Sequence, residues 1–484
     1  MTDSFKDIPF QSKKKLGDLN SISTTVQSHT TKLTDTGNNI NDRGINIKKP
    51  PTPLVAVKGD GIADDYSAFQ AIINYAQDNA ISLYIPAGNY LVSQTLLVTK
   101  RLKVLGDGMR TSKIKYSGTG VAMRIKPSSA SHSTFYDLRD FSLEPSVVGG
   151  GTYGLEVELV VGTYFSNWEM HRVYIGDFGN YGMFLNNDVN NANGFFTGTI
   201  RKSWITNGVK GTNIGDSISI VENTITGKFT GINFTHLAGA RQVVIKENNI
   251  TTAGGVIALT DADQPAILNN QLEHQTYMGN YTGTTGGFVY LKDATAAEIR
   301  GNTISPAGAS SAMVAADYAI LIDGTSSLCD LSNNTISRGE TYHIGFTAAT
   351  ANNTASSSNN FDSPAVISNL STGVSNRGID IALTPINSWV TYETGSDIYA
   401  KKLDSGLVVV RGALKSGTVT SGTILTYLPA GLRPNRKKRF QVTNFNGTVF
   451  SSATLLIETS GAIMIMSTAA NNLLHLDGIQ FTTD

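Results

Sequence analysis

Two aspartates in the second half of the sequence have spacing that suits the cleavage of glycosidic bonds. Asp261 and Asp293 each lie nine residues before an asparagine, Asn270 and Asn302, and these two asparagines are 32 residues apart. If the chain retraces its path over this interval as neighbouring strands, the two acids stack at the strand spacing of about 4.8 Å. Retaining glycosidases hold their two carboxyl groups about 5–5.5 Å apart, and inverting ones about 6.5–9.5 Å apart. Acids on adjacent repeats therefore suit the shorter arrangement.

Two further acids belong to the same candidate group. Asp263 lies two residues after Asp261, so on a strand both side chains point to one face. Glu273 follows the asparagine phrase at Asn270 directly. The alternative interpretation is structural, because acids at turns of a repeat often only bind backbone N–H groups. The predicted catalytic residues are Asp261, Asp263, Glu273 and Asp293.

A second group of residues could bind the substrate. Arg241 and His274 could complement an anionic sugar or the charge that develops during cleavage. Glu247 directly precedes an asparagine in the same register. Aromatic residues gather between residues 153 and 204, where exposed rings would stack on sugars and buried rings would fill the core. The predicted substrate-binding residues are Arg241, His274, Glu247, Trp168, Tyr174, Tyr181 and Trp204.

The element that must position these residues is a repeat. A polar residue, often Asn, is followed after one residue by an aliphatic residue. The aliphatic positions are Leu143, Ile175, Ile205, Ile225, Ile250, Leu272, Ile304 and Ile336. Their intervals of 20 to 32 residues predict a solenoid of short strands, with the aliphatic side chains stacked inside. We expect the asparagines to lie at turns and to form ladders, with insertions such as residues 277–287 projecting as loops.

Composition excludes several classes of function. Lys and Arg together number 38, as do Asp and Glu, so the net charge of zero argues against general capture of nucleic acid. No apolar run approaches the ~20 residues of a membrane span, so we expect no membrane insertion. The N-terminus lacks the apolar stretch of a secretory signal. Cys329 is the single cysteine, which excludes an intrachain disulfide.

The sequence also lacks the motifs of two other chemistries. Its seven histidines are scattered, with no His-x-x-x-His pair, so we expect neither a metal nor another cofactor. There is no Gly-x-Ser-x-Gly nucleophile motif. Carboxylate chemistry on the side of the solenoid is what remains.

Residues 1–53 carry a sparse heptad pattern. Its apolar positions, each seven apart, are Leu19, Val26, Leu33, Ile40 and Ile47. The pattern predicts a short coiled coil that joins identical chains, followed by a proline-rich linker at residues 49–53. The alternative is a flexible polar tail, because residues 37–39 (Gly-Asn-Asn) disfavour a helix.

A distinct block at residues 56–108 predicts a turn, a helix and several strands. Gly59-Asp60-Gly61 permits a tight turn, and Asp64 or Asp65 can cap a helix that buries an apolar face. That face consists of Phe69, Ile72, Ile73 and Ala76. The acids of the block, which include Asp60 and Asp107, are explained by turns and caps.

This block resembles the opening of the pectate-lyase-like superfamily found in bacteriophage tailspikes. The motifs that carry the resemblance are Gly59-Asp-Gly-x-x-Asp-Asp65, Ile85-Pro-Ala-Gly-Asn-Tyr90 and Leu105-Gly-Asp-Gly108. The resemblance is close over roughly residues 55 to 110 and implies a right-handed parallel β-helix whose first coil is covered by the helix. Glu273, with its preceding asparagine phrase, also resembles a phrase that recurs in such tailspikes. Pectate lyase chemistry is not implied.

The C-terminal residues 366–484 have a different pattern, with alternating strands and turn signals that predict a compact β-sandwich. Leu428-Pro-Ala-Gly-Leu-Arg433-Pro434 is similar to a phrase near the end of many phage tail-fibre proteins. That similarity implies a terminal domain for trimerisation or glycan binding.

The sequence therefore predicts a mainly β homotrimer with an attachment segment (1–53), a right-handed parallel β-helix (54–365) and a terminal β-sandwich (366–484). We expect a tailspike that binds a bacterial surface polysaccharide or teichoic acid. It would hydrolyse this glycan, attach to a phage tail or baseplate protein through its N-terminus and act in the virion at the cell surface. A non-enzymatic adhesin and a polysaccharide lyase are the alternatives. Hydrolysis is favoured over lyase chemistry because no base constellation beside a uronate site is visible.

Overall fold

The structure is a computed structural model in which most of the chain can be described. The described residues are 40–41, 44–129, 134–187, 194–237, 241–253, 255–274, 287–305, 318–337, 342–347, 349–356, 358–362, 367–369, 375–377, 380–393, 395–403, 406–467 and 470–483. Residues 1–39, which contain most of the predicted coiled coil, lie outside this part. No helix in the described part is long and apolar enough to span a membrane.

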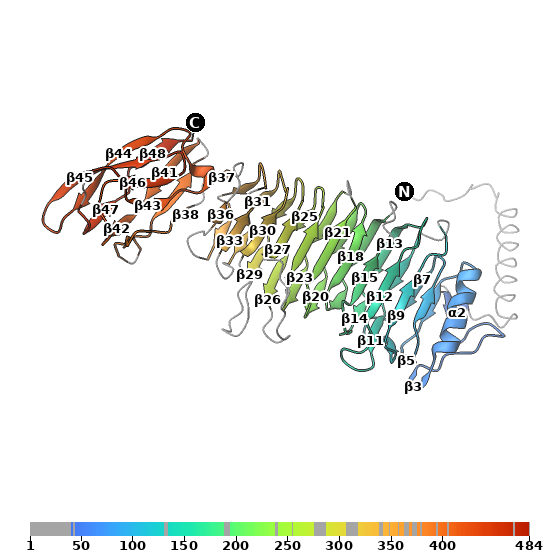
Figure 1. The fold of residues 1–484 in the computed structure, drawn as a ribbon. Helices are drawn as coiled ribbons and strands as arrows, with labels where there is room; N and C mark the ends of the chain where they lie inside the picture. Colours follow the sequence, from blue (N-terminus) through green and yellow to red (C-terminus); the bar gives the residue numbers. More distant parts are fainter. Residues whose placement is uncertain are drawn as a thin grey trace, which may run out of the picture.

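Three long sheets of parallel strands wind around one core and form a β-helix (Figure 1). Each coil contributes one strand to sheet C, then one to sheet A, then one to sheet B. The predicted parallel β-helix is confirmed.

The parallel strands of sheet A follow one another along the axis. They are β2 (Gly44–Asn46), β4 (Leu83–Ile85), β7 (Lys103–Gly106), β10 (Asp137–Arg139), β13 (Phe165–His171), β16 (Phe195–Arg201), β19 (Ile218–Val221), β22 (Val243–Lys246), β25 (Ala266–Leu268), β28 (Glu298–Arg300), β31 (Asp330–Ser332), β34 (Thr354–Ser356) and β37 (Ser375–Arg377). The parallel pairing thus continues to β37, while the sequence pattern placed the end of the β-helix near residue 365.

Sheet B contains the strands that carry the aliphatic repeat. They are β3 (Asp60–Asp64), β5 (Gly88–Val92), β8 (Ser112–Tyr116), β11 (Ser142–Pro145), β14 (Tyr174–Ile175), β17 (Trp204–Thr206), β20 (Thr224–Gly227), β23 (Asn249–Thr252), β26 (Gln271–His274), β29 (Thr303–Ser305), β32 (Thr335–Ile336) and β35 (Asn360–Phe361).

Sheet C closes each coil on the third side. Its strands are β6 (Leu96–Val98), β9 (Val121–Ile125), β12 (Tyr153–Glu158), β15 (Met183–Asn186), β18 (Val209–Ile214), β21 (Ile232–His236), β24 (Ile257–Thr260), β27 (Gly287–Lys292), β30 (Tyr318–Asp323), β33 (Tyr342–Phe346) and β36 (Ile367–Asn369).

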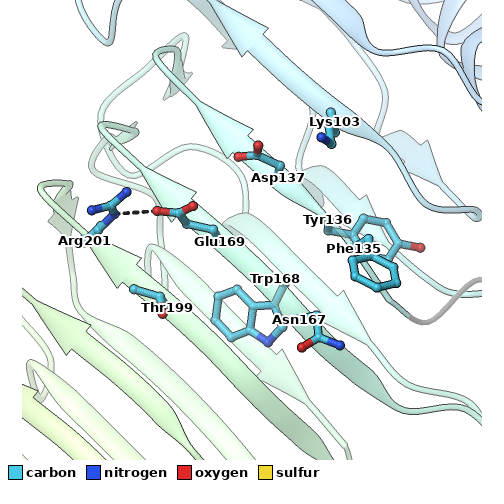
Figure 2. Close-up of a pocket in the computed structure, with 9 residues that line it drawn as sticks. All are labelled: Lys103, Phe135, Tyr136, Asp137, Asn167, Trp168, Glu169, Thr199 and Arg201. Carbon is cyan, nitrogen blue, oxygen red and sulfur yellow. Dashed lines mark hydrogen bonds and ion pairs between the residues drawn. The ribbon is translucent and has the colours of Figure 1, made fainter.

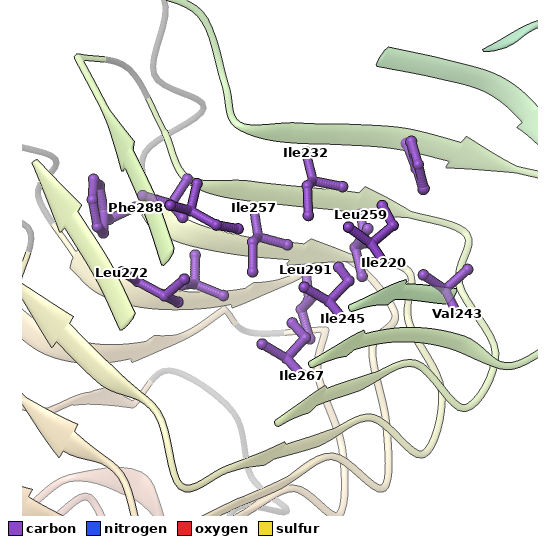
Figure 3. Packing of buried hydrophobic residues seen from close by; sticks show 14 of the residues in the cluster. Ile220, Ile232, Val243, Ile245, Ile257, Leu259, Ile267, Leu272, Phe288 and Leu291 are labelled. Atoms are coloured by element: carbon purple, nitrogen blue, oxygen red, sulfur yellow. The ribbon is translucent and has the colours of Figure 1, made fainter. Parts of the chain in front are cut away.

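Aliphatic side chains at equivalent positions of successive coils fill the interior. Ile205, Ile225 and Ile250 pair in register on sheet B and are fully buried. Figure 3 shows the same stacking for Ile245 and Ile267 of sheet A. Because the strand period is two, the side chains that alternate with these point outward and are free for function.

A ladder of buried asparagines lies at the corner between sheets A and B. Its members are Asn223, Asn248, Asn270, Asn302, Asn334 and Asn359. The side-chain oxygen of each accepts hydrogen bonds from the backbone N–H and the side-chain amide of the asparagine one coil before, at 2.9–3.0 Å. The predicted ladder is confirmed. It satisfies polar groups that the corner would otherwise bury without partners.

The residue before each of these asparagines has a left-handed backbone conformation. The positions are Lys202, Glu222, Glu247, Asn269, Gly301 and Asn333, with φ between 49° and 69°. This conformation turns the chain sharply from sheet A into the corner, and Asn and Gly adopt it at low cost. It also points each side chain at this position toward solvent, as for Glu222 and Glu247.

One helix covers the first coil, as predicted (Figure 1). α2 (Tyr66–Asp78) buries Phe69, Ile72, Ile73 and Ala76. The side chain of Gln77 accepts hydrogen bonds from the N–H groups of Thr99 and Lys100 at 2.6 and 2.7 Å, which ties α2 to the residues after β6.

The acids of this first block have the structural roles that were predicted. Asp60 accepts hydrogen bonds from the backbone N–H groups of two residues of its own turn. Asp64 accepts one from the N–H of Tyr66 at the start of α2. Asp65 accepts two from the loop before it, and Asp107 accepts one from the hydroxyl of Tyr84. None of these four carboxylates is therefore needed for catalysis.

The chain enters the β-helix earlier than its heptad pattern suggested. β1 (Ile40–Asn41) pairs antiparallel with β2, and β2 pairs in parallel with β4. Ile47, the last heptad position, is fully buried in the core.

The C-terminal region is antiparallel and lies at the far end of the β-helix (Figure 1). One sheet contains, in spatial order, β39 (Val390–Thr391), β42 (Ala413–Lys415), β47 (Leu473–His475), β44 (Lys438–Phe445), β45 (Phe450–Ile457), β46 (Ala462–Ile465) and β43 (Ile424–Tyr427). A second antiparallel group continues from sheet A through β38 (Ile381–Ala382), β40 (Tyr399–Lys402), β41 (Leu407–Arg411) and β48 (Ile479–Thr482).

The tail-fibre-like phrase has a structural role in this region. It forms a short 3-10 helix, η2 (Ala430–Leu432), between two strands. Leu428 and Leu432 are fully buried, and Nε of Arg433 donates a hydrogen bond to the carbonyl of Leu428 at 3.0 Å. The phrase therefore fixes a turn.

Candidate functional site

A hollow of about 490 Å³ lies on the outer face of sheet A, over β7, β10, β13 and β16 (Figure 2). It has an aromatic side and a charged side. The lining residues are Lys103, Phe135, Tyr136, Asp137, Asn167, Trp168, Glu169, Thr199 and Arg201.

The aromatic side is built by a corner that repeats on successive coils. Phe135 and Asn167 both have positive φ, 66° and 51°, immediately before the strand residues Tyr136 and Trp168. In the next coil the residue equivalent to Trp168 is Gly198. A Cβ at Gly198 would lie 2.0 Å from Cε2 of Trp168, so the missing side chain leaves room for the indole ring.

The rings of this corner differ in exposure. Phe135 is 58% exposed, whereas Trp168 is 5% exposed. Trp168 and Tyr136 each pack against the buried ring of Phe165, at centroid distances of 5.6 and 4.7 Å. Burial raises the pKa of Tyr136, so its hydroxyl stays protonated at neutral pH. A ligand in the hollow would meet one open ring and the edges of two fixed ones.

The charged side holds two acids on adjacent coils. Asp137 of β10 and Glu169 of β13 are direct partners in the parallel register, and both point outward beside the hollow (Figure 2). The spacing of neighbouring strands is about 4.8 Å. This arrangement is close to the carboxyl separation of about 5–5.5 Å in retaining glycosidases.

Two arginines hold these carboxylates in the structure. Arg139 contacts Oδ1 of Asp137 through Nε at 2.5 Å and Oε2 of Glu169 through Nη2 at 2.8 Å. Arg201, one coil further along, contacts the other oxygen of Glu169. The hydrogen bond to Asp137, aided by the negative charges nearby, raises the pKa of Arg139. The group is therefore a pair of acids bracketed by two permanent positive charges.

A histidine lies between the two arginines in the same outward row. Arg139, His171 and Arg201 occupy equivalent positions on β10, β13 and β16. His171 is 7% exposed, and burial together with the charges of Arg172 and Arg201 lowers its pKa. Its imidazole is therefore neutral at pH 7, and no acid among the described residues forms an ion pair with it.

The predicted catalytic acids occupy different parts of the coil. Asp261 and Asp293 lie at equivalent positions of adjacent coils, in the corner between sheets C and A, where the N–H of Asp261 donates to the carbonyl of Lys292. Both have positive φ, 58° and 52°. Oδ1 of Asp293 accepts hydrogen bonds from the N–H and hydroxyl of Thr325 at 2.7 and 2.9 Å. Asp293 therefore has a turn role.

The other two predicted acids are separated from each other. Asp263 forms an ion pair with Arg241, Oδ2 to Nε 3.1 Å, between adjacent coils. Glu273 lies on β26 of sheet B and accepts a hydrogen bond from Gln271. A sheet A strand and the asparagine corner lie between Asp263 and Glu273 along the chain, so the structure does not bring the four acids together.

The predicted binding residues are also dispersed. Trp168 lines the hollow, whereas Tyr181 is buried and stacked on Phe229 at 5.2 Å. Tyr174 and Trp204 lie together on sheet B. Glu247 is exposed at the corner between sheets A and B, 3.1 Å from Nζ of Lys246. The side chain of His274 lies outside the described residues.

The acids of the hollow could have been found by the register argument that selected Asp261 and Asp293. Asp137 lies six residues before Leu143, and Glu169 lies six residues before Ile175. The register was counted only over the coils that end at Leu272, Ile304 and Ile336, where the intervals are equal. The earlier coils therefore escaped it. Among the described residues no group of three or more acidic, His or Cys side chains is placed to bind a metal ion.

Residues 55–258 match a protein family described as rhamnogalacturonase A/epimerase, pectate lyase-like. No curated protein sequence matches the chain significantly. The matched range contains the hollow with both of its acids.

Several solved structures are similar to the chain at TM-scores below 0.5, too low to carry a conclusion about function. ORF18 of Geobacillus virus E2 is 13% identical, with 90% of this chain and 78% of that chain covered and a TM-score of 0.42. The receptor binding protein gp15 of Listeria phage PSA is 28% identical, with 22% and 64% covered and a TM-score of 0.19. The Dettilon tailspike protein gp208 is 14% identical, with 91% and 94% covered and a TM-score of 0.34. From the family match and the sheet pairings, the chain contains a parallel β-helix of the pectate-lyase-like kind.

Proposed function

We propose that this protein is a bacteriophage tailspike that binds a bacterial surface glycan and hydrolyses it at the hollow on sheet A. The observation that carries the proposal is the pair Asp137 and Glu169, in register on adjacent coils beside an aromatic wall. The family description, which names enzymes that act on polysaccharides, supports a glycan as substrate. The tailspike-like motifs of residues 55 to 110 and the tail-fibre-like phrase support a phage origin.

In this proposal one acid protonates the glycosidic oxygen and the other attacks or stabilises the sugar. Without a ligand both carboxylates are bound to guanidinium groups. Substrate hydroxyls must therefore displace a contact of Arg139 or Arg201 before an acid can donate its proton. The exposed ring of Phe135 supplies an apolar wall for a sugar face.

The ion pairs also favour a second candidate, a tail-fibre adhesin without turnover. Carboxylates that are already held by arginines serve as fixed hydrogen-bond acceptors for sugar hydroxyls. In that case the hollow only binds the glycan. The acids Asp261, Asp263, Glu273 and Asp293 remain a separate proposal for catalysis, to be tested by the same assay.

The proposed assembly is a homotrimer, attached to a phage tail or baseplate protein through residues 1–53 and acting at the bacterial surface. The heptad pattern of those residues supports it. Light scattering on the full chain tests the oligomer, and a mass of one chain would exclude the trimer.

Incubation with purified surface glycans of candidate hosts tests the function. New reducing ends without ultraviolet absorbance would indicate hydrolysis, and absorbance of an unsaturated uronate would indicate a lyase. Binding without any product would favour the adhesin. If no glycan is bound or cleaved, the proposed function is wrong.

A further inference from the structure

A cluster on the outer face of sheet B combines a guanidinium with two aromatic rings. The guanidinium carbon of Arg110 lies 4.2 Å from the ring centroid of Tyr174 and 4.9 Å from that of Trp204. The two rings pack edge to face at 5.8 Å. The same face of the β-helix lies across the asparagine corner from the hollow, since Trp204 follows Arg201 by three residues.

The cluster is open to solvent. Trp204 is 37% exposed, whereas Trp168 and Trp389 are 5% and 3% exposed. The side chain of Arg110 is exposed as well. Burial of the indole therefore does not explain its position, and the folded chain keeps a large flat apolar ring at its surface.

Arg110 is held by the rings and has no carboxylate partner among the described residues. The other outward arginines of this part of the chain differ, because Arg139, Arg172 and Arg201 all contact acids. Stacking on an aromatic face orients a guanidinium but leaves its N–H groups free along the edge. Such an edge matches the two oxygens of a carboxylate.

The surface beyond the cluster continues as a polar row along the helix axis. On successive coils the residues in register with Trp204 are Thr224, Asn249, Gln271, Thr303, Thr335 and Asn360. All of them are uncharged hydrogen-bonding side chains, spaced by about 4.8 Å. A polymer with hydroxyl groups could meet one such side chain at each coil.

We propose that Arg110, Tyr174 and Trp204 form a second glycan-binding site, which takes a sugar unit that carries a carboxylate. The sugar stacks on Trp204, its carboxylate accepts hydrogen bonds from Arg110, and the chain continues over the polar row. The inference rests on the proposed function only in taking a glycan as the ligand. The site binds and does not cleave.

Affinity electrophoresis of the full chain tests the site. The gels contain polygalacturonate or alginate, two polyuronates of different stereochemistry, or the carboxyl-reduced form of each. The wild-type protein is expected to be retarded in at least one polyuronate gel and in neither reduced gel. Arg110→Gln and Trp204→Ala are each expected to lower the affinity by about tenfold or more. Arg110→Lys keeps the charge but not the planar edge and is expected to fall between them.

Arg300→Gln provides the matched control, because Arg300 is an exposed arginine of sheet A that pairs with Glu298. Its affinity is expected to equal that of the wild type. The proposal is overturned if the wild type is not retarded by either polyuronate, if the reduced gels retard it equally, or if Arg110→Gln binds as well as Arg300→Gln. Retardation that persists in Glu169→Gln, together with lost turnover, would separate this site from the hollow. Retardation without turnover in any protein would contradict the proposed hydrolysis alone.

Discussion

Asp137 and Glu169 lie side by side on adjacent strands of sheet A, and the guanidinium of Arg139 contacts both carboxylates. A parallel register makes this pairing a direct consequence of coil length. Asp137 and Glu169 are 32 residues apart, which is one full coil, so any change in that length would separate them. The geometry of the candidate site therefore depends on the insertions of its own coil.

Gly198→Ala is expected to disturb the hollow without touching its acids. A Cβ at this position would lie 2.0 Å from Cε2 of Trp168, so the indole must move. Overpacking of this kind costs about 1–3 kcal/mol of stability. The displaced ring should also emit fluorescence at longer wavelength, because it becomes more exposed. Thr199→Ala, on the next outward position, is the control and should leave both properties unchanged. Identical spectra for the two variants would show that the indole does not depend on Gly198.

Asn270→Ala is expected to destabilise the β-helix by about 3 kcal/mol. The side chain donates to the carbonyl of Ile245 and to Asn302, and it accepts from Asn248, so its loss leaves several buried polar groups unsatisfied. Urea unfolding followed by circular dichroism measures the change.

The control for this ladder variant is Asn249→Ala, an exposed position of the next strand inward along the axis. A change within about 0.5 kcal/mol is expected there. Equal destabilisation by the two variants would mean that the ladder contributes nothing beyond a surface asparagine.

His236 makes the stability depend on pH. Burial lowers the pKa of His236 to about 4, and its Nδ1 is 3.0 Å from the carbonyl oxygen of Thr260. In the unfolded chain the pKa is near 6.5. Below that value the unfolded state binds a proton that the folded state does not, so stability falls as the pH decreases from about 6.5 to 4. Above pH 6.5 the contribution of this residue is constant.

The expected loss from this single group is on the order of 3 kcal/mol between pH 7 and pH 4. His236→Gln removes the titrating group. The wild type should therefore lose more free energy of unfolding than this variant over the same pH range. Parallel curves for the two proteins would contradict the assignment.

The scaffold was predictable because its signals are local. One buried aliphatic side chain and one corner asparagine recur in each coil, and the capping helix has apolar residues at helical spacing. The first-block acids were predictable for the same reason, since Asp60 and Asp64 bind backbone groups of their own turns.

The candidate site was less predictable because it depends on register across coils of unequal length. Asp137 and Glu169 share a row only when each coil is counted back from its own aliphatic residue. Exposure could not be derived from composition either. Tyr181 is buried and Trp204 is exposed, although both belong to the same aromatic-rich segment.

The rate at which the protein generates reducing ends from its host glycan, measured for the wild type and Glu169→Gln, tests the central claim most directly. Loss of an acid that transfers a proton is expected to lower the rate by about 10²–10⁴-fold, with glycan binding retained. Glu298→Gln is the matched control, because Glu298 also lies on sheet A beside an arginine two residues on, 3.0 Å away. It should keep the full rate. Wild-type turnover by Glu169→Gln, together with a loss in Asp261→Asn or Asp293→Asn, would contradict the account and move catalysis to the corner between sheets C and A.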